Sequence, residues 1–193
     1  MSPNLIPYMV PLPTDPVFLM LRPDEVAARC GSRLAWRLRD QNGMVGEPLE
    51  EDRLHVSLCS LPPFGHLTPG IRAKIGDLVM GLTMPPFRAG FRWVESFRRE
   101  HRKRPLVLRG GDETLIGAMM LQEELTASLS KIYPVRPRKA FTPHMTLLYD
   151  WIGLSERVVE EICWTVREVV LVCSLRGRHR HITLGRWPLL ASA

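Results

Sequence analysis

Apolar positions along the chain follow two spacings, which predicts a mixture of strands and helices. A short apolar run such as 17–21, bounded by Pro16 and Pro23, is typical of a buried strand. Longer stretches with apolar residues three or four positions apart predict helices that bury one face. Strands are expected over 17–21, 54–61, 87–97, 105–109, 145–149, 164–175 and 182–189, and helices over 24–38, 68–82 and 113–133.

These elements carry local signals for their ends and their buried faces. Thr68 before Pro69 predicts an N-cap followed by proline at the first helical position, and Gly177 predicts a hairpin turn between the last two strands. The order of strands and helices predicts the α+β class with largely antiparallel sheets. The apolar side chains expected in the core include Val26, Leu34, Leu38, Leu115, Met119, Leu125, Leu129, Phe141 and Tyr149.

The sequence predicts one domain preceded by a short arm. No low-complexity segment or long linker divides residues 17–193, whereas residues 1–16 contain five prolines and are expected to form an extended arm. No run of 18 apolar residues predicts a transmembrane helix, and no basic region precedes an apolar run as in a signal peptide. We therefore expect a cytoplasmic protein with reduced, buried thiols at Cys30, Cys59, Cys163 and Cys173.

Four of the six histidines are followed two positions later by serine or threonine. Alternate residues of a strand share a face, so His55 and Ser57 should face one side while residues 54, 56 and 58 pack inward. His144 and Thr146 should do the same on a second strand. One such pair alone is typical of a polar strand edge, but two equivalent pairs that each lead a strand favour a shared cleft.

The other two histidine pairs have weaker links to chemistry. His66 precedes the expected helix cap Thr68, which gives that pair a structural explanation. His181 and Thr183 lie on the last expected strand. There His181 either lines the cleft and contacts substrate, or is a solvated residue of the hairpin.

Two histidine–hydroxyl pairs suit chemistry on a phosphodiester. An imidazole with a pKa near 6.5 can be neutral in one copy and protonated in the other at pH 7. One ring then takes a proton from the attacking oxygen, and the other gives a proton to the leaving oxygen. The neighbouring hydroxyls can donate hydrogen bonds to the non-bridging phosphate oxygens. This chemistry requires neither a cofactor nor a metal.

The charge of the chain agrees with an anionic partner. Lys and Arg total 26 and Asp and Glu total 20, a formal net charge of +6. The basic run Arg98–Arg104, which includes His101, is either a solvated hairpin tip or a clamp on the phosphates of a nucleic acid. A second basic cluster precedes the His144 strand and is expected near the mouth of the cleft; it consists of Arg136, Arg138 and Lys139.

Three segments together resemble the two-histidine (2H) phosphoesterase superfamily. They are Arg53–Leu58 (RLHVSL), Phe141–Leu147 (FTPHMTL) and the tail Val166–Leu189. The resemblance is to the branch of 2′-5′ RNA ligases and RNA 2′,3′-cyclic phosphodiesterases, and it covers nearly all of the chain after about residue 17. It implies a bilobal, pseudo-twofold fold with two antiparallel β-sheets around a central cleft and helices packed outside.

The resemblance also implies roles for residues. His55 and His144 would be catalytic, and Ser57 and Thr146 would bind the substrate phosphate, with no metal. His144 would activate water and His55 would protonate the leaving group, so that a cyclic phosphate opens to a 2′-phosphate. Serine at position 57 departs from the more usual threonine; it keeps the hydroxyl but loses the stiffness of a β-branched side chain.

Several functions stay open at this stage. The first is hydrolysis of 2′,3′-cyclic or 2′-5′-linked phosphates at RNA ends by a monomeric protein with no membrane partner. The second is ATP-independent 2′-5′ RNA ligation, in which a 5′-hydroxyl replaces water. A non-catalytic RNA-end binder is a third, and a zinc hydrolase built from His55, His144 and His181 is a fourth.

Overall fold

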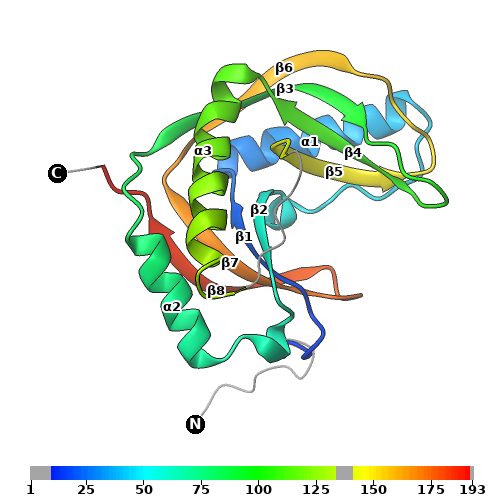
Figure 1. Cartoon of the computed structure of the whole chain (residues 1–193). Helices are drawn as coiled ribbons and strands as arrows, with labels where there is room; N and C mark the ends of the chain where they lie inside the picture. The colour runs from blue at the N-terminus through cyan, green and yellow to red at the C-terminus, as the bar shows by residue number, and fades with distance from the viewer. Residues whose placement is uncertain (1–9, 134–140, 192–193) are drawn as a thin grey trace, which may run out of the picture.

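The computed structural model describes residues 10–133 and 141–191, apart from the side chains of residues 112–115. The described chain forms an α+β fold in which three α-helices pack against a β-sheet (Figure 1). Its elements are β1 (Val17–Leu21), α1 (Glu25–Gln41), η2 (Glu51–Arg53), β2 (Val56–Leu61), η3 (Phe64–His66), α2 (Pro69–Met80), β3 (Phe87–Ser96), β4 (Arg104–Gly110), α3 (Asp112–Leu129), β5 (His144–Asp150), β6 (Arg157–Val166), β7 (Glu168–Leu175) and β8 (Arg180–Pro188).

The strands form one sheet with the order β6-β3-β4-β5-β2-β1-β7-β8. Every pairing between neighbouring strands is antiparallel. In the middle, β2 and β5 are joined by a single residue pair, Val56 and Met145. We call this junction the seam. The α+β class is confirmed, but the two separate sheets that were expected are two halves of one sheet joined at the seam.

The two halves repeat one arrangement, which agrees with pseudo-twofold symmetry. In one half a helix connects the antiparallel strands β1 and β2, and in the other a helix connects β4 and β5. The order outward from the seam is β2-β1-β7-β8 on one side and β5-β4-β3-β6 on the other. The two strands that meet at the seam are those that carry the histidine pairs.

Helices hold the seam from the core side of the sheet. α1 packs against β5 and β6, which belong to the half opposite its own strands, and α3 packs against β2 and β3. α1 approaches closely because it has glycine at position 31. An added Cβ there would lie 3.1 Å from the Leu54 side chain and 3.4 Å from the Met145 side chain. Figure 1 shows α2 farther away, beside β8.

The predicted strands and helices are all present, with one important difference. The long strand expected over 164–175 is two strands, β6 and β7, which meet at Arg167. β6 pairs with β3 in one half of the sheet, whereas β7 pairs with β1 and β8 in the other. The chain therefore crosses between the halves at Arg167 and Glu168, which stand between two stretches rich in apolar residues.

Three residues predicted to lie in the core are exposed. Val26 and Met119 are 63% and 45% exposed, on the outer faces of their helices. Tyr149 is exposed because the β4–β5 register shifts at Leu147, after which the strand presents its other face. Leu34, Leu38, Leu125 and Leu129 are buried as predicted, Phe141 packs against the core, and Leu115 is among the side chains outside the description.

The remaining local predictions have mixed outcomes. Thr68 caps α2 by accepting a hydrogen bond from the Ile71 amide at 3.3 Å, and Gly177 lies in the β7–β8 turn with a φ of 70°. Cys59 and Cys173 are buried, but Cys163 is exposed and Cys30 is half-buried. No helix in the described part of the chain has the length and apolar character needed to cross a membrane.

Candidate functional site

The two histidine pairs lie on the faces that strand alternation predicted. Leu54, Val56 and Leu58 are buried, whereas His55 and Ser57 between them are half-buried. On β5, the half-buried His144 and Thr146 alternate with buried neighbours in the same way. Each pair therefore points away from the core, on the side of the sheet where the sequence predicted a cleft, which we call the cleft face.

The seam brings the two pairs together. Val56 and Met145 are partners in an antiparallel register, so the neighbouring positions place His55 across from Thr146 and Ser57 across from His144. Directly opposed residues on one face have Cβ atoms about 5 Å apart. Each imidazole therefore lies beside the hydroxyl residue of the other strand as well as its own.

Both imidazoles are oriented by the same hydrogen bond. Nδ1 of His55 lies 2.6 Å from the carbonyl oxygen of Arg53, and Nδ1 of His144 lies 2.7 Å from the carbonyl oxygen of Thr142. A carbonyl oxygen only accepts, so Nδ1 must carry a hydrogen in both rings. The proton that each ring can gain or lose is consequently the one on Nε2. In His55, Nε2 lies 3.1 Å from Oγ of Ser57, whose hydroxyl donates to it when the ring is neutral.

An aromatic side chain contacts each of the two rings. Phe18 of β1 lies 5.3 Å from His55, and Phe97, which follows β3, lies 4.9 Å from His144, measured between ring centroids. Phe97 also begins the β3–β4 loop, in which the whole basic run 98–104 is exposed. The solvated hairpin tip expected for this run is thus present, and its base lies beside His144.

His181 lies within the same group of side chains. Its ring centroid is 5.1 Å from that of His55 and 5.6 Å from that of Phe18. The ring is half-buried, and its Nδ1 is buried with no hydrogen-bond partner among the described residues. Of the two interpretations of the sequence, the structure favours a cleft residue over a solvated hairpin residue.

Burial and positive charge hold His55 and His181 neutral at pH 7. Burial, together with the charges of Arg53, Arg22 and His144, lowers the pKa of His55 to about 4, although the hydrogen bond to the Arg53 carbonyl opposes this shift. Burial also lowers the pKa of His181 to about 3, with contributions from His55 and the same two arginines. The Nε2 lone pair of His55 is therefore available to accept a proton.

Arginines at corresponding positions in the two halves have different surroundings. Arg109 is the β4 partner of His144, and it forms ion pairs with Glu95 and Glu156. On β1 the register that pairs Leu21 with Val56 places Arg22 across from His55. Arg22 forms no ion pair within the described residues. Neither arginine could be assigned to the site from the sequence, because only strand pairing places them beside the histidines.

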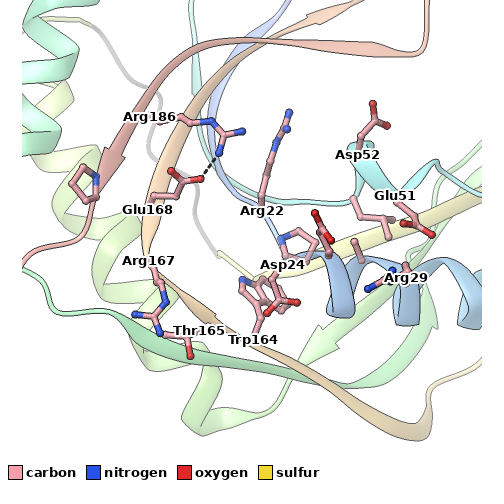
Figure 2. Close-up of a pocket in the computed structure, with 15 residues that line it drawn as sticks. Arg22, Asp24, Arg29, Glu51, Asp52, Trp164, Thr165, Arg167, Glu168 and Arg186 are labelled. Atoms are coloured by element: carbon pink, nitrogen blue, oxygen red, sulfur yellow. Dashed lines mark hydrogen bonds and ion pairs between the residues drawn. The ribbon is translucent and has the colours of Figure 1, made fainter.

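A pocket of about 990 Å³ is lined by Arg22, the strand partner of His55, and by Leu54, the neighbour of His55 in sequence; the two histidines themselves are not among its lining residues. Figure 2 shows Arg22 and Arg186 extending toward the same side of it, with Glu168 hydrogen-bonded to Arg186. The wall also includes Trp164 of β6 and the first turn of α1. A volume of this order can hold a nucleotide-sized ligand.

The other predicted residues lie elsewhere. His66 is exposed in η3, beside the cap of α2. Among the side chains that the structure describes, no three of His, Cys, Asp or Glu are placed to share a metal ion. The second basic cluster, Arg136, Arg138 and Lys139, lies outside the described residues.

No family model and no curated protein matches the sequence, but solved structures share its fold. TT0787 of Thermus thermophilus has a TM-score of 0.73 at 20% identity, covering 92% of this chain and 100% of that one. A phosphoesterase has a TM-score of 0.71 at 18% identity, covering 92% and 99%. E. coli LigT complexed with 3′-AMP has a TM-score of 0.69 at 20% identity, covering 91% and 98%.

These similarities extend over nearly the whole of both chains. LigT has also been solved with phosphate, ATP and NADP⁺. This chain therefore has the fold of the phosphoesterase and LigT structures. The resemblance drawn from the histidine motifs is confirmed for the fold.

Proposed function

We propose that this protein is a 2H phosphoesterase that hydrolyses 2′,3′-cyclic or 2′-5′-linked phosphates at RNA ends without a metal ion. The observation that carries the proposal is the seam, where His55 and His144 face one cleft with Nδ1 bound to a backbone carbonyl and Nε2 as the nitrogen for proton transfer. The fold shared with a phosphoesterase and with LigT supports the same class. We further propose a cytoplasmic monomer with one domain over residues 17–193 and an N-terminal arm over 1–16.

The proposed reaction needs one base and one acid. For a 2′,3′-cyclic phosphate, a water oxygen attacks phosphorus while the base takes the water proton. The bond from phosphorus to the ribose 3′ oxygen breaks, and the acid gives its proton to that oxygen, which leaves a 2′-phosphate. The hydroxyl of Thr146 donates a hydrogen bond to a non-bridging oxygen, where negative charge concentrates, and the hydroxyl of Ser57 does the same once it turns away from Nε2 of His55.

The surroundings of His55 support it as the base and His144 as the acid. A ring with a pKa of about 4 is unprotonated at pH 7, so it is ready to accept a proton and has none on Nε2 to give. On the His144 side, in contrast, the carboxylates of Glu95 and Glu156 pair with Arg109, so the positive charge of that arginine is balanced. This assignment is the reverse of the one implied by family resemblance.

ATP-independent RNA joining is a second candidate, supported by the fold shared with LigT. The same two proton transfers would serve it, with an RNA 5′-hydroxyl in place of water. Product analysis with and without an acceptor RNA end distinguishes the two reactions.

The test is turnover of a nucleoside 2′,3′-cyclic phosphate in excess chelator by the wild type, His55→Ala and His144→Ala. The proposal predicts turnover by the wild type and loss in both variants, with the exposed His66→Ala as a matched control that keeps full activity. Turnover that chelator abolishes would contradict it in favour of the zinc alternative. Binding of cyclic-phosphate ends without turnover would favour the non-catalytic binder.

A further inference from the structure

We infer that Arg22 and Arg186 form a second phosphate subsite beside His55, which binds the internucleotide phosphate next to the reacting one. The protein would then act on oligonucleotide ends in preference to single nucleotides. This inference rests on the proposed function and adds the size of its substrate.

Strand register places both arginines on the cleft face. Met20 and Val170 are partners on β1 and β7 and pack together, and Phe18 of the same β1 face contacts His55. Arg22 follows Met20 by two positions, so it shares that face. Arg186 is the β8 partner of Val170, so it shares the face as well.

Arg22 lacks the counter-ion that would otherwise satisfy it. Its Nε is buried without a hydrogen-bond partner, and none of the ion pairs among the described residues includes it. Burial and the nearby charge of Arg186 lower the pKa of Arg22, against weaker opposing effects of Asp52 and Glu168. A half-buried cation beside a second cation is stabilised when an anion binds between them.

Arg186 is held in place by its own partner. Its Nη1 lies 2.6 Å from Oε1 of Glu168, and this pair faces the pocket beside Arg22 (Figure 2). A guanidinium presents five N–H donors, so one carboxylate leaves most of them available. A phosphate between the two arginines could accept from both in forked geometry, which guanidinium groups suit better than ammonium groups do.

The position of the subsite selects a particular phosphate. Arg22 lies across from His55 on the adjacent strand, at the spacing of one strand pair, and His55 contacts the scissile phosphate in the proposed reaction. The pocket of about 990 Å³ extends from Arg22 to β8 and the end of β6. The phosphate that reaches the arginine pair therefore belongs to the next nucleotide along the strand.

The experiment compares two substrates in one set of variants. The first is a nucleoside 2′,3′-cyclic phosphate, and the second is a dinucleotide that has the same cyclic end and one internucleotide phosphate. The readout is the ratio of kcat/KM for the dinucleotide to kcat/KM for the mononucleotide. A hydrogen bond to a charged group contributes enough that Arg22→Gln and Arg186→Gln should each lower this ratio about ten- to a hundredfold.

Arg88→Gln is the matched control. Arg88 also pairs with a glutamate of the adjacent strand, at 2.7 Å, but lies outside the pocket. It should leave the ratio unchanged. Raising the salt concentration provides an independent measure, because each lost contact to a single-strand phosphate should flatten the dependence of log kcat/KM on log salt by about 0.7 for the dinucleotide only.

The outcomes separate this inference from the proposed function. If the wild type turns over neither substrate, the proposed function fails. If it turns over both and the ratio is the same in Arg22→Gln, Arg186→Gln and Arg88→Gln, the subsite is refuted while the function stands. Arg22→Lys guards against a folding defect, because it keeps the charge but loses the fork and should lower the ratio by less than Arg22→Gln does.

Discussion

The pH dependence of kcat/KM tests the role of His55, because a base and an acid predict opposite results. This constant reports the protonation of the free enzyme. The pKa of His55 is about 4. If His55 is the base, kcat/KM should fall tenfold per pH unit below pH 4 and stay level just above it. If His55 is the acid, kcat/KM should fall tenfold per unit above pH 4, or about a hundredfold from pH 4 to pH 6.

Removing the positive charge of Arg53 tests the same assignment in a second way, because it should raise the pKa of His55. Of the charges that lower the pKa of His55, that of Arg53 has the largest effect. An interaction of about 1 kcal/mol, typical of close charges in a water-like medium, corresponds to about 0.7 pKa unit. Arg53→Gln should therefore move the acidic limb of the profile upward by about half a unit to one unit.

The assay is the initial rate at low concentrations of a nucleoside 2′,3′-cyclic phosphate from pH 3.5 to pH 7. Circular dichroism at each pH ensures that the enzyme is folded, and Arg88→Gln serves as a charge-matched control far from His55. A decline in kcat/KM between pH 4 and pH 6, or a limb that moves downward in Arg53→Gln, would refute the assignment of His55 as the base.

Three further predictions concern the hydroxyl of Ser57, the half-buried imidazole of His55 and the buried carboxylate of Asp150. Ser57→Ala should lower kcat about 10²- to 10³-fold in steady-state assays, as loss of one donor to a developing oxyanion does, and Ser57→Thr should retain most of the activity. The pKa of His55 in the folded protein lies below its unfolded value of 6.5, so the unfolded state binds more protons as the pH falls. Up to about 3 kcal/mol of the free energy of unfolding should therefore be lost when the pH falls from 6.5 to 4. Urea unfolding at several pH values measures this loss of stability. The prediction would be wrong if the free energy of unfolding of His55→Asn had the same pH dependence as that of the wild type. Asp150→Ala should lower the free energy of unfolding by about 3 kcal/mol in the same assay, because the carboxylate of Asp150 accepts hydrogen bonds from the amides of residues 45, 46 and 152. An unchanged urea midpoint would contradict this prediction.

Local patterns predicted the elements of the fold better than their arrangement. The run 17–21 is bounded by proline and became β1, and the Thr68 cap was visible in the sequence. The boundary at Arg167 was not recognised, because apolar residues resume after Arg167 and Glu168 and the change of pairing partner is not visible in the sequence. Tyr149 was misplaced for a similar reason, because the shift at Leu147 depends on how β5 pairs with β4.

The same limit applies to the candidate site. Alternation along single strands was enough to place His55 and Ser57 on one face. The contact of His181 with His55 was not predictable, because β7 and β1 lie between their strands in the sheet and only its curvature brings the two rings together. The unpaired state of Arg22 likewise depends on which carboxylates other strands place nearby.

The seam has a consequence for how such a site can change. Only one residue pair joins β2 to β5, so the side chains packed behind the sheet help to determine the gap between the two imidazoles. Gly31 contacts this packing at Leu54 and Met145, each of which is adjacent in sequence to one of the histidines. A larger residue in the interior could therefore widen the gap and alter which phosphate esters fit. Selection for a new substrate could act on the core while every residue of the cleft stays the same.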